Sequence, residues 1–497
     1  MLDPERARAL IEGFEGRRVV VAGDVYLDEY VHCRPAGVSP EMPVLRAVEE
    51  RVEHALGAAG NVAASLAALG AQVALAAVVG ADDAGRRIAE LAGAARLDVD
   101  SLVTDPDRRT GVFSRIVLHG ATGAGHHQIR VDREVGAAPS AAVRASLEQA
   151  VDARLDGADA VVLADYDETA RRLGVLAPDL AGALVERARR RGIPVVATSR
   201  RHPEQFAGAE HLFVNREEAR RLGLPAEQGA GAFARRLAAE GRHGLVTITL
   251  GGEGAVTGTA DGVHEIPALP VRVVDPCGAG DALLAATTLA RLAGADPDEA
   301  TRLGVHAAAL AVGFVGTRPV TAPELVNLVR FGGAGAGKLH DPESLGRILD
   351  GLRGSHRIVF TNGFFDLFHS GHVELLRQAR ALGDLLVVAL NSDRSTRENK
   401  GEGRPVLGER ERVEIISSLE FVDYVTVFDE LTPINVIRRL RPHLIVKGGS
   451  YRPEEVVGKD LVESRGGRVV VIPYAGRVTT EKLIRSIKAA SDGTRPE

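Results

Sequence analysis

The chain has 497 residues, of which 45% are hydrophobic and 26% charged, and its formal net charge of −6 excludes a global basic field for nucleic acid. Its two cysteines, Cys33 and Cys277, argue against a disulfide framework and are typical of a reducing compartment. The charged N-terminus lacks a signal-peptide core and no apolar run reaches the roughly 18 residues of a membrane span, so we expect a cytoplasmic protein with no membrane partner.

Short runs rich in β-branched residues alternate with helical patterns rich in Ala, Leu and Arg along the whole chain. The runs in the first part of the chain are Arg18 to Ala22, Val73 to Val79, Ala160 to Leu163, Pro194 to Ala197 and Leu245 to Leu250. This alternation predicts α/β layers with mostly parallel strands.

The first of these strands leads into Asp28, and a small-residue stretch containing Gly57 and Asn61 opens a helix further on. Ligands gather at the carboxyl ends of parallel strands, where Asp28 could accept hydrogen bonds from sugar hydroxyls. Gly57 would let a ligand approach the backbone, and the Asn61 amide offers both a donor and an acceptor. The simpler alternatives are a solvated loop acid for Asp28 and a helix cap for Asn61.

A Gly-Ala-Gly turn, Gly278-Ala279-Gly280, joins a β-rich run from Val271 to Val274 to a long helical pattern that starts at Ala282. Backbone N–H groups at the start of that helix can converge on an anion. Asp281 lies in the same turn, where a carboxylate suits a general base for an attacking hydroxyl. The combination indicates phosphoryl transfer from a nucleotide to an alcohol. A capping Asp in a Gly-rich turn is an equally good interpretation of the turn taken alone.

The Gly/Asn stretch at 57–61 and the turn at 278–281 together resemble the two signatures of the ribokinase (PfkB) sugar-kinase family. Asn215-Arg216-Glu217-Glu218 resembles the family's N-x-x-E motif, and the segment from Thr249 to Gly254 resembles its nucleotide loop. The resemblance implies a ribokinase-like α/β/α fold, Asp281 as catalytic base and Gly278, Ala279 and Gly280 as anion hole. It implies dimerisation through this domain and binding of ATP with Mg²⁺, which Glu218 would help to place indirectly.

The same resemblance assigns the other site residues of this half. The sugar-binding residues would be Asp28, Gly57, Asn61 and Arg130. The ATP-binding residues would be Asn215, Arg216, Glu217, Glu218, Thr249, Gly251 and Gly254.

Two lysines that the family usually carries are missing. Where the family usually has D-Y-x-K-G, this chain has Glu168 in the place of the lysine, and where the family has D-P-K, it has Arg200. Losing cations beside a polyphosphate weakens charge neutralisation, although Arg200 or Arg201 could compensate. The kinase half is therefore either adapted to a variant substrate or catalytically weak. In the second case it could be a degenerate module that only binds or dimerises.

A Gly/Ala-rich segment follows Val329. Gly332, Gly337 and Lys338 have the spacing of a phosphate loop, but Leu339 stands where a Ser or Thr should hold Mg²⁺, and a helical pattern precedes the segment. We therefore predict a linker at 331–356, between a kinase domain at 1–330 and a second α/β domain at 357–497.

The second domain starts with a strand at 357–360 followed by His369 and His372 at the start of a helix. Two histidines three residues apart can both face a phosphate chain above the helix N-terminus and donate to charge developing there. A zinc site is the competing interpretation, but this domain has no cysteine and no H-E-x-x-H motif.

The segment from Thr361 to His372 closely resembles the HxGH signature of cytidylyltransferase-like nucleotidyltransferases. The resemblance implies a Rossmann-like domain in which His369 and His372 are catalytic. The ATP-binding residues would be Asn362, Gly363, Phe364, Phe365, Asp366, Gly371, Asn391, Asp393, Lys400, Arg404, Lys447, Gly448, Thr479 and Thr480.

The order of the two halves resembles the bifunctional heptose-phosphate kinase and adenylyltransferase family of ADP-heptose synthesis. The resemblance implies phosphorylation of a heptose 7-phosphate at O1, followed by transfer of AMP from ATP to the heptose 1-phosphate. Two alternatives stay open: only the nucleotidyltransferase works, or both halves act on another sugar. ATP is preferred over CTP in the second step by resemblance alone.

Overall fold

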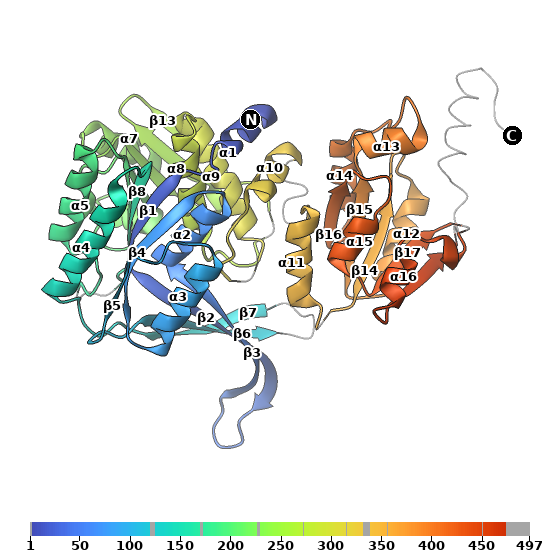
Figure 1. The fold of residues 1–497 in the computed structure, drawn as a ribbon, viewed down its shortest axis with the longest axis horizontal. Helices are drawn as coiled ribbons and strands as arrows, with labels where there is room; N and C mark the ends of the chain where they lie inside the picture. The colour runs from blue at the N-terminus through green and yellow to red at the C-terminus, as the bar shows by residue number, and fades with distance from the viewer. Residues whose placement is uncertain are drawn as a thin grey trace. The chain divides into compact units, whose positions relative to one another are not determined.

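The computed structural model divides the chain into two compact units, residues 1–326 and 327–497 (Figure 1). It describes residues 2–119, 125–168, 172–225, 229–271, 273–314, 316–331, 338–354, 356–449 and 451–473. Each unit is built around its own sheet and its own hydrophobic core. Among the helices that fall in these ranges, none combines the length and the apolarity needed to cross a membrane.

A nine-stranded sheet forms the centre of the first unit, in the order β13-β12-β11-β10-β9-β8-β1-β4-β5. The strands are β1 (Arg18–Gly23), β4 (Gln72–Gly80), β5 (Leu102–Asp105), β8 (Ala160–Asp165), β9 (Val195–Ser199), β10 (His211–Asn215), β11 (Leu245–Thr249), β12 (Ala255–Thr259) and β13 (Val263–Ile266). The strands from β5 to β11 pair in parallel, and β12 and β13 are antiparallel. The five runs predicted as strands are all strands of this sheet, so the α/β prediction is confirmed.

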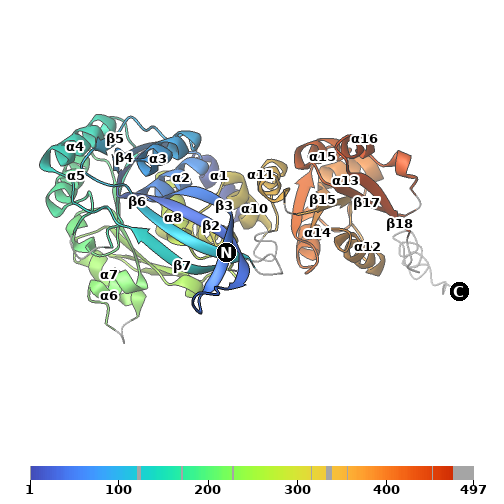
Figure 2. The same ribbon diagram turned by 90° about the horizontal axis from the view of Figure 1, so that it is seen from below.

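Helices cover both faces of this sheet (Figures 1 and 2). Side chains of α4, α5 and α7 bury themselves against β1, β8 and β9 in one apolar cluster, and α2, α8 and α9 pack together as a second layer. The helices of this unit are α1 (Pro4–Glu12), α2 (Ala59–Ala68), α3 (Asp83–Ala94), α4 (Ala141–Leu155), α5 (Pro178–Arg190), α6 (Arg216–Arg221), α7 (Ala230–Ala239), α8 (Ala279–Leu292) and α9 (Pro297–Ala311). Helix α10 (Ala322–Phe331) includes the boundary between residues 326 and 327. Because the parallel strands are buried on both faces, they read as continuous apolar runs.

A separate four-stranded sheet, in the order β3-β2-β6-β7, belongs to the same unit. Its strands are β2 (Val25–Val38), β3 (Leu45–Ala58), β6 (Gly111–His119) and β7 (Gly125–Arg133). The tip of the β2–β3 hairpin extends away from the rest of the unit (Figure 1). The first residues of β2 and the last of β3 are buried beside β1, so this sheet starts at the same edge where the parallel strands end.

The second unit holds a five-stranded parallel sheet in the order β16-β15-β14-β17-β18. Its strands are β14 (Ile358–Gly363), β15 (Leu385–Asn391), β16 (Tyr424–Phe428), β17 (Leu444–Gly448) and β18 (Arg468–Ile472). Its helices are α11 (Pro342–Leu352), α12 (Ser370–Arg380), α13 (Asp393–Lys400), α14 (Glu409–Ser417), α15 (Ile434–Leu440) and α16 (Lys459–Glu463). Two apolar clusters, one on each face of the sheet, form its core.

Part of the predicted linker at 331–356 is folded. The Asp341 side chain caps α11 by accepting from the backbone N–H of Ser344 at 2.9 Å, and Pro342 occupies the first helical turn. Leu345 and Leu349 of this helix are fully buried in one of the two cores of the second unit. The linker prediction was therefore wrong for 342–352, because glycine content dominated the interpretation of a segment that also carries a helix-start signal and an apolar i, i+4 pair.

Candidate functional site

The Gly-Ala-Gly turn forms the start of α8, as predicted. Gly278 caps the helix with φ of 80°, a left-handed conformation that favours glycine, and a Cβ at this position would lie 3.2 Å from the Asn61 amide nitrogen. Asp281 is in the first turn of the helix. The run from Val271 to Val274 is not a strand in its described residues, and Val273 and Val274 are exposed, so that expectation was wrong. Valine content predicted a strand where no neighbouring strand offers pairing.

Two side chains from distant segments hold the Asp281 carboxylate. The Asn61 amide donates a hydrogen bond to Oδ2 at 2.5 Å, and the Tyr166 hydroxyl donates to Oδ1. Asn61 is therefore inside α2 and faces the turn, and it is not a helix cap. Burial raises the pKa of Asp281, and these two hydrogen bonds together with the charge of Arg200 oppose that rise. The arrangement fixes a carboxylate at a helix N-terminus, in the place where a general base is needed.

Asp28 and Gly57 lie close together on the neighbouring strands β2 and β3, two residues apart in register. Asp28 on β2 is buried and forms an ion pair with Arg115 of β6 at 2.9 Å. A Cβ on Gly57 of β3 would lie only 2.9 Å from the carboxyl carbon of Asp28. Gly57 thus makes room for the Asp28 side chain, which is a packing reason that the sequence reasoning did not consider. Burial raises the pKa of Asp28, and Arg115 and, more weakly, Arg130 counteract this.

Arg130 lies on β7, with its guanidinium over the Phe113 ring at 4.0 Å. It also donates to Asp132 at 2.7 Å and to Glu168 at 3.3 Å. The structure therefore brings Asp28, Gly57, Asn61 and Asp281 together around one edge of the large sheet, and Arg130 borders this group.

The N-x-x-E motif forms the junction between β10 and α6. The Asn215 side chain accepts from the Glu218 backbone at 2.8 Å, and the Glu218 carboxylate accepts from the Asn215 backbone at 2.7 Å, which is a capping box. Glu218 also pairs with Arg200 at 3.0 Å. A cavity of about 330 Å³ opens here, lined by Glu168, Arg200, Arg201, Asn215, Glu217, Glu218 and Arg221. The motif thus has a structural role and also borders a polar, charged cavity.

The other residues of the first unit that were predicted to bind ATP lie at strand ends next to the N-x-x-E motif. Thr249 ends β11, next to Asn215 at the end of β10, and Gly251 begins a tight turn with φ of 61°. Gly254 closes this turn, where a Cβ would lie 2.1 Å from the carbonyl oxygen of Ile266. Arg216 pairs with Glu253, the residue before Gly254 in this turn, at 2.7 Å. Thr249, Gly251 and Asn215 therefore lie at one edge of the sheet, and the Arg216 side chain reaches the turn.

His369 and His372 lie at the junction between β14 and α12. Their ring centroids are 3.9 Å apart, and His369 is the N-cap residue of the helix. His369 Nδ1 accepts from the Gly371 backbone at 3.1 Å, and His372 Nδ1 accepts from the His369 backbone at 3.4 Å. Burial lowers the pKa of both rings, that of His372 to about 4. At neutral pH both are therefore neutral imidazoles whose protons are on Nε2, ready to donate above the helix N-terminus.

Lys447 is the penultimate residue of β17, which pairs with β14. Its ammonium donates to the Asn362 backbone carbonyl at 3.1 Å and to the Asn362 side chain at 3.0 Å. Burial lowers the pKa of Lys447 to about 8. A partly buried cation with Gly448 next to it is well suited to contact a phosphate or a ribose near the histidine pair.

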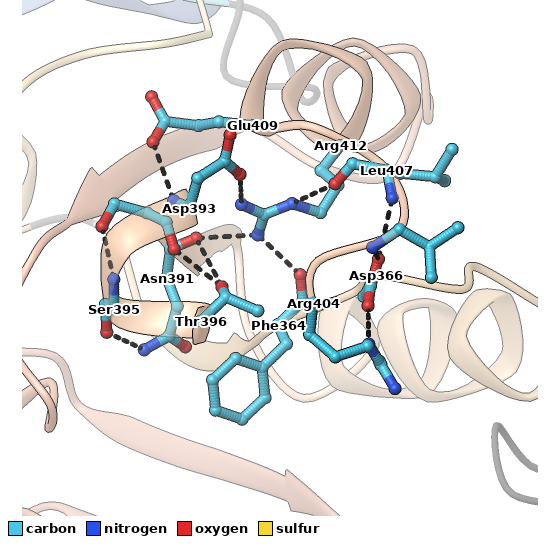
Figure 3. Close-up of polar contacts among 12 residues, drawn as sticks. Phe364, Asp366, Asn391, Asp393, Ser395, Thr396, Arg404, Leu407, Glu409 and Arg412 are labelled. Carbon is cyan, nitrogen blue, oxygen red and sulfur yellow. Dashed lines mark hydrogen bonds and ion pairs between the residues drawn. The ribbon is translucent and has the colours of Figure 1, made fainter. Parts of the chain in front are cut away.

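Asp366 and Arg404 form an ion pair in the second unit (Figure 3). Asp366 also accepts from the backbone N–H groups of Val406 at 2.6 Å and Leu407 at 2.9 Å. Both residues were predicted to bind ATP. In the structure their contacts hold the loop after α13 against the segment between β14 and α12. Asp366 therefore positions that loop.

Arg412 of α14 is a residue that sequence reasoning missed. It is fully buried and donates to the carbonyl oxygens of Phe364 at 2.8 Å and Asn391 at 2.7 Å, and to the Asp393 carboxylate at 2.7 Å (Figure 3). These three predicted site residues are thus tied together by one guanidinium. In the sequence, Arg412 looks like any charged residue on an amphipathic helix, so only the tertiary structure reveals its role.

Three further residues that were predicted to bind ATP are Lys400, Thr479 and Thr480. Lys400 lies with its ammonium 4.9 Å from the centroid of the Phe364 ring. Thr479 and Thr480 fall outside the described residues. Within the residues that the structure describes, no cluster of three or more His, Cys, Asp or Glu side chains could hold a metal ion, so the zinc interpretation has no support there.

Family models match both units. The model described as pfkB family carbohydrate kinase matches residues 18–324, and the cytidylyltransferase-like model matches residues 360–482. Phosphofructokinase-2 from Escherichia coli, solved with substrates and products, resembles the first unit with a TM-score of 0.52. It is 19% identical, over 63% of this chain and 99% of that one, which shows the fold alone.

Relatives match along nearly the full length. A bifunctional protein HldE from Pelobacter propionicus is 37% identical over 98% of this chain and 99% of its own. Another from Geobacter metallireducens is 38% identical over 95% of this chain and 96% of its own. With a carbohydrate kinase unit followed by a cytidylyltransferase-like unit, the chain belongs to the family of bifunctional HldE proteins.

Proposed function

We propose that this protein catalyses two steps of ADP-heptose synthesis. The first unit phosphorylates a heptose 7-phosphate at O1 with ATP, and the second transfers AMP from ATP to a heptose 1-phosphate. The observation that carries the kinase half is the Asp281 carboxylate, held by Asn61 and Tyr166 in the first turn of α8. The full-length likeness to bifunctional relatives supports the pairing of the two steps.

In the kinase step, Asp281 accepts the proton of the anomeric O1–H. As it does so, O1 forms a bond to the γ-phosphorus of ATP, and the bond from that phosphorus to the β,γ-bridging oxygen breaks. ADP leaves with the electron pair of that bond. The backbone N–H groups of Gly278, Ala279 and Gly280 stabilise the charge on the transferring phosphoryl group, because they lie at the start of α8, where N–H groups have no acceptor within the helix, and the Ala279 N–H makes only a long bond of 3.4 Å to the Pro276 carbonyl oxygen.

Mg²⁺ fits the kinase site as a companion of ATP. The carboxylate of Glu218 already accepts from Asn215 and pairs with Arg200, so its contact with the metal would pass through water. Mg²⁺ takes most of its ligands from phosphates and water, with one or two carboxylates, which this cavity offers in Glu168, Glu217 and Glu218. When bound, the metal neutralises charge on the phosphates.

In the second step, an oxygen of the sugar 1-phosphate forms a bond to the α-phosphorus of ATP. The bond from that phosphorus to the α,β-bridging oxygen breaks, and pyrophosphate leaves with the electron pair. The Nε2–H groups of His369 and His372 donate to this developing charge. A separate phosphatase must remove the 7-phosphate between the two steps. Neither step needs a covalent intermediate with the enzyme.

We also propose that the first unit forms a homodimer, as the family resemblance implies, and that its four-stranded sheet forms the interface. Large apolar side chains are exposed on this sheet and on the loop that joins β2 to β3. Those on the strands are Val38, Leu45, Val48, Val52, Ile129 and Val131, and those on the loop are Met42 and Val44. Such a patch on a monomer would be costly to leave in water, and a second copy would cover it. Sedimentation velocity of the wild type and of a Met42→Glu/Leu45→Glu variant tests this, with a shift to monomer expected for the variant.

The free thiols of Cys33 and Cys277 agree with a reducing compartment, so we propose that both steps take place in the cytoplasm. The absence of the two family lysines favours the competing proposal, in which the kinase unit only binds or dimerises. The held Asp281 carboxylate and the charged cavity beside Asn215 favour an active kinase.

The deciding experiment supplies D-glycero-D-manno-heptose 7-phosphate, ATP and Mg²⁺ to the purified full-length protein. Mass spectrometry is expected to detect heptose 1,7-bisphosphate with the wild type and none with Asp281→Asn. A second reaction supplies heptose 1-phosphate with ATP or CTP, and ADP-heptose is expected from ATP. ADP-heptose without any bisphosphate would show that the kinase unit is inactive or uses another sugar.

A further inference from the structure

Arg200 occupies a position between the nucleotide motif and the catalytic base. It follows β9, and its guanidinium pairs with Glu218 at 3.0 Å. The same guanidinium lies over the ring of Tyr166, 5.0 Å from its centroid. Tyr166 in turn donates its hydroxyl hydrogen bond to Asp281. A chain of contacts therefore runs from Glu218 through Arg200 and Tyr166 to Asp281.

The Arg200 side chain is held in place and still reaches the cavity. Its side chain is 40% exposed, whereas that of Glu218 is 6% exposed, so the guanidinium lies at the cavity wall and its carboxylate partner lies behind it. Within the residues that the structure describes, the pairing with Glu218 uses a single N–H of the five that a guanidinium carries. The guanidinium therefore has further N–H donors, and Arg200 is one of the residues that line the cavity.

The other two arginines of this cavity are engaged with the protein backbone. Arg201 donates to the carbonyl oxygen of Glu168 at 2.9 Å, and Arg221 donates to the carbonyl oxygen of Arg200. Both are exposed, and among the described residues it is Arg200 that lies over the Tyr166 ring. They frame the cavity wall, while Arg200 lies toward the base.

The charge of the cavity wall shows why one arginine matters. Three arginines and three glutamates line it, namely Arg200, Arg201, Arg221, Glu168, Glu217 and Glu218, and so the wall is formally neutral. A nucleotide triphosphate carries about four negative charges, and phosphoryl transfer depends on electrostatic stabilisation of the equatorial oxygens. Glu168, which stands where a lysine is usual, adds to the negative charge.

We propose that Arg200 contacts the transferring phosphoryl group of ATP and supplies the cationic stabilisation that lysine gives elsewhere in this family. This assignment rests on the proposed kinase function. Arg200 acts while O1 forms its bond to the γ-phosphorus and the bond to the β,γ-bridging oxygen breaks, and the proton of O1 goes to Asp281. Its planar fork can donate two parallel hydrogen bonds to phosphoryl oxygens, which a lysine ammonium cannot do.

Holding Arg200 on Tyr166 also places it near the base without neutralising it. The charge of Arg200 opposes the rise that burial causes in the pKa of Asp281, and the Tyr166 ring contacts both groups. One arginine thereby serves both the phosphoryl group and the carboxylate that faces it.

The test compares full-length Arg200→Met and Arg200→Lys with wild type in the kinase assay. A cation that acts on the transferring phosphoryl group is worth ~10²–10³ in kcat, so Arg200→Met is expected to lose that factor, with a smaller rise in KM for ATP. Arg200→Lys is expected to recover part of the loss. Arg190→Met, which removes a surface arginine of α5 that pairs with Glu186 at 3.6 Å, is the matched control and should keep wild-type kcat.

A second substitution separates a catalytic role from a merely structural one. Glu168→Lys in the Arg200→Met background returns a lysine to the cavity wall at the position that the family uses, and we expect it to raise kcat at least ~5-fold above Arg200→Met alone. ADP-heptose formation from supplied heptose 1-phosphate by the second unit should be the same in every variant, which monitors the integrity of the chain.

The outcomes separate this assignment from the proposed function. A wild type that phosphorylates heptose 7-phosphate, with Arg200→Met within ~3-fold of its kcat, would overturn the role of Arg200 and leave the kinase assignment standing. A wild type with no kinase activity on any sugar phosphate would overturn both. A normal kcat with a raised KM alone would make Arg200 a binding residue of the ground state and would also contradict the proposal.

Discussion

The Tyr166 hydroxyl donates a hydrogen bond to Oδ1 of Asp281, although 115 residues separate them in the chain. Tyr166 follows β8 and Asp281 starts α8, so the sheet and the helix layer meet at this bond. The bond favours the ionised form of the carboxylate and lowers the pKa of Asp281, against the effect of burial. The proposed base therefore depends on a phenol from a distant segment of the chain.

Tyr166→Phe removes this bond and little else. Because the pKa of Asp281 then rises, less of the base is ionised in mildly acidic solution, and we expect the acidic limb of the kinase kcat/KM profile to move to higher pH. The loss of rate should be largest on the acidic limb and small at alkaline pH. A profile that keeps its acidic limb and is scaled down equally at every pH would rule out this role of Tyr166.

The sequence predicted the frame of the kinase site well because local signals specify it. The β-branched runs identify strands β1, β4, β8, β9 and β11, and parallel pairing then brings their carboxyl ends to one edge. Asn61 and Asp281 lie on helices that open at glycine-rich turns, which are also local signals, so their meeting at 2.5 Å follows from the layering. The fold class and the strand ends around the proposed base could therefore be predicted from the sequence.

What the sequence did not reveal are side chains whose partners are chosen by tertiary packing. Arg412 looks like a surface residue of α14 but is fully buried between two strand ends. Gly57 suggested room for a ligand, and the room is taken by Asp28. Helix α11 was not predicted, because the glycine-rich segment that precedes it in the sequence indicated a linker. In each case the deciding contact is with a residue many positions away, which periodicity and motif spacing do not report.

Gly57→Ala should damage the sugar site while sparing the nucleotide site. The added Cβ would lie 2.9 Å from the Asp28 carboxyl group, which must then move and disturb its ion pair with Arg115. We expect KM for the heptose substrate to rise ~10-fold with KM for ATP unchanged. Gly93→Ala is the matched control, since a Cβ there meets nothing within 4 Å. Equal changes in both KM values would contradict a local effect.

Arg412→Met should destabilise the second unit. The substitution leaves the carbonyl oxygens of Phe364 and Asn391 and the Asp393 carboxylate without their buried donor. Breaking such a buried charged network costs about 3–5 kcal/mol. Calorimetry and hydrogen exchange are expected to show early unfolding of residues 356–449 and normal protection of β1 and β8. Arg410→Met removes an exposed neighbour on the same helix and should have no such effect, and a variant as stable as wild type would refute the bracing role of Arg412.

Lys447 should give the nucleotidyltransferase step an alkaline limit. Burial lowers the pKa of its ammonium to about 8, so the side chain loses its charge as the pH rises through that value. If the charge binds a phosphate of ATP, KM for ATP in ADP-heptose formation should rise above pH 8, while the neutral histidine pair is unaffected in that range. Lys447→Arg keeps its charge throughout and should show a flat KM from pH 7 to 9.5. The kinase step of the same protein is the control, because its first unit does not contain Lys447. A wild-type KM that stays flat across this range would mean that the charge of Lys447 does not act on the nucleotide.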